Sequence, residues 1–115
     1  MVVKAYFLLR EDLNMSPAKM SIQVGHGVDF IWSGAKDNHA KWVQESYRRK
    51  ILLKISSLEK LNNLRKTLED NNIPYHDIID EGFTEFEGRT LTGIVIYPIE
   101  ETTLPKSLAR LRLWV

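Results

Sequence analysis

The sequence predicts an α/β protein of three layers, in which helices cover both faces of a mixed, mostly parallel four-stranded sheet. Two observations support this fold class. Short apolar segments rich in strand formers alternate with longer segments of helical periodicity, in the order strand, helix, helix, strand, helix, strand, strand, helix. Helices connect the first three strands, which we therefore expect to be parallel, whereas the short connection to the fourth strand predicts an antiparallel pair.

A single domain over residues 1–115 is expected, because the chain has the length of one compact domain and contains no repeat or linker. The first strand is expected over residues 2–9, an almost continuous apolar run typical of a strand buried on both faces. A helix then begins at Ser16 and Pro17, since a serine N-cap followed by proline is a helix-start signal, and Gly34 ends it.

This first helix has two different faces at about 100° per residue. The face expected to enter the core is apolar: Met20, Val24, Val28 and Ile31. The other face is expected to present hydrogen-bonding groups and a ring elsewhere: Lys19, Gln23, His26 and Phe30. Gly25 and Gly27 each cost about 1 kcal/mol relative to alanine inside a helix, so we expect close packing or the approach of a ligand there.

The remaining elements follow from similar signals. A second helix is expected over residues 36–48 and a second buried strand over 50–55. Ser56 and Glu59 form a capping-box pattern before a third helix, which Asn71 and Asn72 stop. Its inward residues are expected to be Leu58, Leu61, Leu64 and Leu68. Strands over 75–79 and 91–97, the latter ended by Pro98, a short helix over 100–108 and an edge strand over 111–114 complete the fold.

Composition excludes several function classes. The chain has no cysteine, which excludes disulfides and thiolate metal sites and suits a reducing compartment. No apolar run approaches the ~20 residues needed to cross a bilayer, so we expect a cytoplasmic protein with no membrane partner. The three histidines do not have metal-ligand spacing, and we expect neither a metal nor a cofactor. Glycine-rich phosphate loops and a G-x-S-x-G elbow are absent, which argues against nucleotide hydrolysis and serine esterase chemistry.

Two distant polar residues are expected to meet at one edge of the sheet. Ligands of open α/β sheets bind at the carboxyl ends of parallel strands. The loop after the first strand leads to Lys19, and the third strand ends at Asp80. On the residues alone, simpler interpretations remain open: Asp80 capping the turn at Gly82, His26 packed between helices, and Lys19 solvated.

The residues from Arg10 to Gly27, REDLNMSPAKMSIQVGHG, resemble the opening signature of the type 2 peptidyl-tRNA hydrolases. The positions that match in register are Arg10, Asp12, Leu13, Met15, Lys19, Gln23 and His26. Lys54 resembles the lysine that ends the family's second strand. In PYHDIIDEGFT, Asp80, Gly82 and Thr84 match the family's D-A-G-R-T segment. The similarity extends in order over nearly the whole chain.

This resemblance implies hydrolysis of the ester that joins a peptide to the 3′ ribose of tRNA, without a metal cofactor and often in a homodimer. It makes Lys19, Asp80 and Thr84 the candidate catalytic residues. The candidate substrate-binding residues are Gln23, His26, Arg10, Lys54 and Gly82. A basic group near two aromatic residues is the candidate for contact with the tRNA backbone: Lys41, Arg48, Arg49 and Lys50.

The chain also departs from the family pattern. Pro17 stands where the family has a lysine, Phe83 where it has an arginine, and Glu81 where it has an alanine. These changes make the mouth of the site less positive. They motivate an alternative, a non-catalytic module that binds RNA or a protein on the same scaffold. A third hypothesis, a scaffold or dimerisation protein, depends on exposed aromatic residues such as Trp114.

Overall fold

A four-stranded mixed sheet forms the centre of the computed structural model, which describes residues 2–83 and 86–114. The strands are β1 (Val3–Arg10), β2 (Lys50–Ile55), β3 (Tyr75–Asp80) and β4 (Thr90–Glu100). Their order across the sheet is β2-β1-β4-β3. β1 and β2 are parallel neighbours, whereas β4 is antiparallel to both β1 and β3. The first three strands therefore run in one direction as expected, but β4 separates β3 from β1 and leaves one parallel pair.

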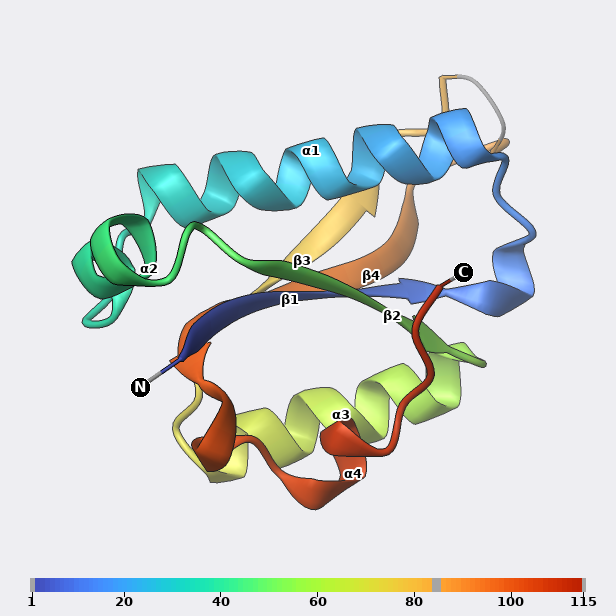
Figure 1. Cartoon of the computed structure of the whole chain (residues 1–115). Helices are drawn as coiled ribbons and strands as arrows, with labels where there is room; N and C mark the ends of the chain where they lie inside the picture. The colour runs from blue at the N-terminus through green and yellow to red at the C-terminus, as the bar shows by residue number, and fades with distance from the viewer. Residues whose placement is uncertain (1, 84–85, 115) are drawn as a thin grey trace.

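Helices cover both faces of this sheet, which confirms the three-layer α/β class (Figure 1). α1 (Pro17–Ser33) and α2 (His39–Glu45) lie on one face, and α3 (Leu58–Asp70) and α4 (Lys106–Ala109) lie on the other. Side chains alternate between the two faces along β1. Phe7 therefore packs in the core between the sheet and α1 and α2, whereas Leu8 packs in the core between the sheet and α3 and α4. Two short 3₁₀ turns, Glu11–Leu13 and Glu101–Thr103, follow the ends of β1 and β4. No helix in the described residues is long and apolar enough for a membrane crossing.

The buried face of α1 differs from the predicted one. Its buried residues are Lys19, Gln23, Gly27 and Ile31, whereas Met20, Val24 and Val28 are only partly buried. The helix can lie close to the sheet because a Cβ at Gly27 would come within 2.7 Å of the Phe7 ring. The expectation of close packing is thus confirmed at Gly27. At Gly25 it is wrong, since an added Cβ would meet nothing within 4 Å.

Several predicted boundaries were wrong for local reasons. Ser57, not Ser56, caps α3 and accepts a hydrogen bond from the Lys60 N–H at 3.2 Å, which leaves Leu58 exposed. α2 is shorter than predicted, because the chain turns through left-handed backbone at Tyr47 and Arg48. Asn71 is the C-cap of α3, as expected.

The C-terminal third also differs from its prediction. β4 continues through Pro98 because this residue lies where the register of the β1–β4 pair shifts, and a bulge tolerates a residue without an N–H. The predicted helix over 100–108 divides into a 3₁₀ turn and α4, with Pro105 as the N-cap of α4. The predicted edge strand is reduced to one antiparallel bridge between Leu113 and Leu53. Trp114 is half-buried there, and its Nε1 donates to the Leu53 carbonyl at 3.1 Å.

Candidate active site

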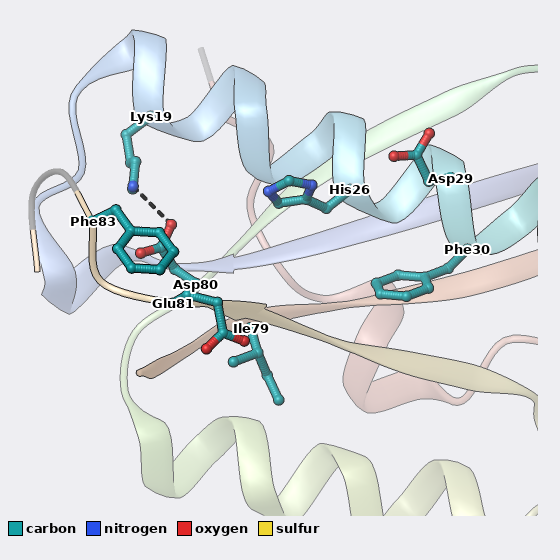
Figure 2. Close-up of a pocket in the computed structure, with 8 residues that line it drawn as sticks. All are labelled: Lys19, His26, Asp29, Phe30, Ile79, Asp80, Glu81 and Phe83. Atoms are coloured by element: carbon teal, nitrogen blue, oxygen red, sulfur yellow. Dashed lines mark ion pairs between the residues drawn. The ribbon is translucent and has the colours of Figure 1, made fainter. Parts of the chain in front are cut away.

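A cleft of about 460 Å³ lies between α1 and the carboxyl end of β3 (Figure 2). Its lining residues come from both elements and from the segment after β3: Lys19, His26, Asp29, Phe30, Ile79, Asp80, Glu81 and Phe83. A volume of this size is typical of sites that bind small organic groups. The cleft lies at the sheet edge where the strand order led us to expect a ligand site.

Lys19 and Asp80 form an ion pair in this cleft. Lys19 Nζ lies 2.7 Å from Asp80 Oδ2, and each side chain is 8% exposed. The N-cap of α1 positions the lysine, because Ser16 Oγ accepts a hydrogen bond from the Lys19 N–H at 3.1 Å. Asp80 is the last residue of β3. The two residues, 61 positions apart in the sequence (80 − 19), therefore meet as expected, and a solvated Lys19 is excluded.

Two further donors hold the Asp80 carboxylate. The Gly82 N–H donates to Oδ1 at 2.7 Å, and Gln23 Nε2 donates to Oδ2 at 3.1 Å. Burial alone would raise the pKa of Asp80, but the ion pair with Lys19 and the bonds from Gly82 and Gln23 outweigh burial and lower this pKa below its usual value. Asp80 thus caps the turn at Gly82 and also faces the cleft as a carboxylate, so the two interpretations of this residue are compatible.

Thr92, on β4, extends this network into the core. Its Oγ1 lies 2.8 Å from Gln23 Oε1 and 3.0 Å from the Ile78 carbonyl, and it can donate to either acceptor. Thr92 and Gln23 are both fully buried. Thr92 was not among the residues predicted from the sequence. The available signal was a polar residue in the apolar segment LTGIVIY, next to a glycine whose added Cβ would clash with β1.

The other predicted substrate-binding residues are divided between the cleft and its surroundings. His26 is exposed and lines the cleft, so it is not packed between helices. Arg10 lies outside the lining and makes an ion pair with Asp12 at 2.8 Å. Lys54 also lies outside it and pairs with Glu11 at 3.5 Å. The predicted catalytic Thr84 lies outside the described residues.

The predicted tRNA-contact residues lie on α2, in the turn after it and at the start of β2, and Figure 1 shows α2 at the C-terminal end of α1, opposite the end that carries Lys19. Arg48, Arg49 and Lys50 lie in the turn between α2 and β2 and at the start of β2, and their cationic groups lie 5.3 to 5.8 Å from the centres of the Trp32, Tyr47 and Trp42 rings. Lys41 makes a long ion pair of 3.8 Å with Glu100. Because Lys19 lies 14 residues (33 − 19) before Ser33, the last residue of α1, this basic cluster lies roughly 20 Å from Lys19 along the helix.

The geometry of the cleft suits reactions that need a carboxylate and a cation side by side. An ionised carboxylate can accept about four hydrogen bonds, and three described donors reach Asp80. One acceptor position is therefore available for a water molecule. A lysine beside it can stabilise negative charge that develops on a substrate oxygen. Among residues 2–83 and 86–114, no group of three or more His, Asp or Glu side chains could hold a metal ion.

Comparison with known proteins identifies the family. The family model described as Peptidyl-tRNA hydrolase PTH2 matches residues 3–114. A peptidyl-tRNA hydrolase of Methanocaldococcus jannaschii is 29% identical over 114 residues, which cover 96% of this chain and 99% of that protein. Peptidyl-tRNA hydrolases of Saccharolobus islandicus and Saccharolobus solfataricus are 29% and 28% identical over 119 residues, covering 97% of this chain and 99% of each relative. These matches confirm the resemblance seen in the sequence, and the chain belongs to the peptidyl-tRNA hydrolase PTH2 family.

Proposed function

We propose that this chain hydrolyses the ester bond between a peptide, or an N-blocked aminoacyl group, and the 3′ ribose of tRNA, which returns the tRNA to translation. Family membership supports this reaction. The observation that carries the assignment to a site is the Lys19–Asp80 ion pair in the wall of a cleft. The buried charge pair in the wall of the cleft favours catalysis over a non-catalytic module, and Trp114, the residue named in support of a scaffold role, is half-buried.

The proposed roles follow from charge and position. Asp80, ionised at neutral pH because its pKa is lowered, accepts a hydrogen bond from the attacking water and orients it, or takes its proton with Thr84 as intermediary. Lys19 stabilises the oxyanion of the tetrahedral intermediate. Gly82 and Gln23 hold the carboxylate, and His26 binds the substrate from the exposed side of the cleft.

An isosteric substitution at Asp80 tests this mechanism. Asp80→Asn removes the negative charge and keeps the shape, so we expect kcat for release of N-acetyl-leucine from N-acetyl-leucyl-tRNA to fall at least about 100-fold, the usual size of a general-base contribution. The matched control is Asp77→Asn, because Asp77 lies on the same strand in a half-exposed ion pair with Arg65, outside the cleft. Normal turnover by folded Asp80→Asn protein would remove Asp80 from the mechanism.

We also propose that the basic cluster binds the tRNA backbone through Lys41, Arg48, Arg49 and Lys50, and that Arg10 and Lys54 assist at the carboxyl edge of the sheet. The cluster carries no ion pair within 4.0 Å on Arg48, Arg49 or Lys50 among the described residues, so these cations can meet phosphates. Each lost phosphate contact should reduce the slope of log affinity against log salt by about 0.9 for duplex RNA of the acceptor stem. An unchanged slope in Arg48→Ala and Arg49→Ala would count against this surface.

Three further proposals come from the family resemblance: the chain acts as one domain over residues 1–115, in the cytoplasm where translation takes place, and as a homodimer. Sedimentation equilibrium of the purified chain tests the dimer, with a single species at 13.4 kDa as the contrary result. No cofactor is proposed, because a carboxylate, a lysine and water supply the groups that ester hydrolysis needs.

A further inference from the structure

We propose that Phe83 is the stacking surface for the terminal base of the tRNA, so that the cleft binds the last nucleoside as well as the ester. This inference rests on the proposed function and names a part of the substrate that the same site binds. Phe83 stands where the family pattern has an arginine. The substitution therefore changes a charged contact into an aromatic one at the mouth of the cleft.

Phe83 leaves an aromatic ring exposed at the mouth of the cleft. The residue is 91% exposed, although it is among the most apolar residue types and lines the cleft beside the ion pair (Figure 2). One exposed apolar side chain is ordinary on a protein surface, but this ring also borders the cleft, where a flat ligand group can cover it. Unpaired RNA bases stack on phenylalanine rings, and every base presents a flat face for such contact.

The backbone holds this ring next to the reacting groups. Gly82 has a φ of 86°, which an L side chain rarely adopts, and a Cβ there would lie 2.7 Å from the Gly88 backbone. The Gly82 N–H also donates to Asp80 Oδ1 at 2.7 Å. The same turn that orients the carboxylate therefore fixes the residue from which the Phe83 ring projects. A base stacked on Phe83 would place its ribose, and the ester on that ribose, close to Asp80.

The charges of the cleft favour a neutral base over a phosphate at this position. Among the described residues, three acidic side chains, Asp29, Asp80 and Glu81, line the cleft, and the cations beside them are already paired, Lys19 with Asp80 and Arg89 with Glu81. A phosphate would be repelled by this wall, whereas an uncharged base would not. His26 faces the same cleft from α1, and no described residue makes a hydrogen bond to its ring. It can contact the base edge or a ribose hydroxyl.

The experiment measures how much the base contributes with and without the ring. The two substrates are N-acetyl-leucyl-tRNA and the same tRNA ending in a base-free ribose that carries N-acetyl-leucine. We expect the wild type to show a KM about tenfold lower for the substrate with the base, as stacking of one base predicts. Phe83→Ala and Phe83→Leu should reduce this ratio to about one, and Phe83→Trp should retain it. Ile22→Ala, an exposed apolar residue on α1 outside the cleft, is the control and should retain it too.

The possible outcomes separate this inference from the proposed function. A ratio that stays near ten in Phe83→Ala overturns the inference, because the base then binds elsewhere. Loss of activity by the same factor on both substrates also overturns it, since the ring would then contact the acyl group or the loop. Failure of the wild type to cleave either substrate would instead refute the proposed function. Thermal unfolding of each variant confirms that the exposed substitution leaves the fold intact.

Discussion

Replacement of Asp80 by asparagine should destabilise the fold as well as stop catalysis, because it removes the carboxylate that neutralises Lys19. The two side chains are 2.7 Å apart and each is 8% exposed. Removal of one partner from a buried ion pair costs about 3–5 kcal/mol, because the other charge stays behind without compensation. Water can enter the cleft beside this pair and partly solvate the remaining charge, so we expect a smaller cost of about 2–3 kcal/mol, at or below the lower limit of that range.

This loss is large enough to measure in two ways. For a domain of this length, about 4 °C of Tm per kcal/mol predicts a decrease of about 10 °C. Urea unfolding followed by circular dichroism gives the free energy of unfolding directly. Asp77→Asn is the control on the same strand, where the half-exposed pair with Arg65 at 2.8 Å should contribute at most about 1 kcal/mol.

The pH dependence gives the more specific test. The pKa of Asp80 in the folded chain lies below its ordinary value, because donors from Lys19, Gly82 and Gln23 outweigh the opposing effect of burial. The ionised pair therefore contributes its full stability above about pH 4, the ordinary pKa of an aspartate, and loses it as the pH falls through the lower folded-state value.

The difference in unfolding free energy between wild type and Asp80→Asn should thus be constant from about pH 7 to pH 5 and should shrink below about pH 4. A difference that vanishes between pH 7 and 5 would require a raised pKa of Asp80 and would contradict a stabilising ionised pair. An Asp80→Asn variant as stable as Asp77→Asn at pH 7 would show that the pair contributes negligible stability.

Three other predictions concern the network, the packing of α1 and the pH profile of the reaction. Thr92→Val leaves Gln23 Oε1 without its donor, so it should cost about 1–3 kcal/mol and lower kcat more than it raises KM. Thr90→Val, which removes an exposed hydroxyl from the same strand, should do neither. Gly27→Ala should destabilise by about 1–2 kcal/mol in thermal unfolding, because the clash with Phe7 exceeds the gain in helix propensity, whereas Gly25→Ala, in open space, should stabilise by up to about 1 kcal/mol. Because Asp80 ionises below its usual pKa, a plot of kcat/KM against pH should stay level down to about pH 5, and an acid limb near pH 6 would assign the essential base to another group.

Local signals predicted most of the fold because they act over a few residues. Ser16 and Pro17 start α1, and Gly34 is its C-cap, as their chemistry requires. The strand that continues through Pro98 shows where such signals fail. Proline ends a regular strand, but a bulge in the β1–β4 pair removes the hydrogen bond that proline cannot make. The position of that bulge depends on a partner strand about 90 residues away in the chain, and no local pattern contains it (Val3 pairs with Glu100).

The orientation of α1 was predicted wrongly for a related reason. Hydrophobic periodicity assumes that polar residues face away from the core. Lys19 and Gln23 instead face the sheet, because Asp80 and Thr92 supply partners from β3 and β4. The order of the strands predicted that Lys19 and Asp80 meet, and the family motif then assigned both of them, with Gln23, to a site. Their positions in the family motif indicated a site, whereas hydrophobic periodicity indicated only which face of α1 should be buried. Thr92 lies outside the matched motif, so neither source identified it.

The placement of Lys19 is costly for the fold, and this cost supports a chemical role. The positive end of the helix dipole lies at the first turn of α1, where a cation is disfavoured and an anion is stabilised. The lysine is also buried there, where apolar side chains of similar volume would pack at least as well as an ion pair. The helix N-terminus and the ammonium group place positive charge at the Asp80 end of the cleft, beside the carboxylate proposed to orient water, while Asp29 and Glu81 keep the lining acidic elsewhere. An ester whose carbonyl oxygen enters that potential gains stabilisation as negative charge develops on it, and the interaction is stronger in the transition state than in the bound substrate.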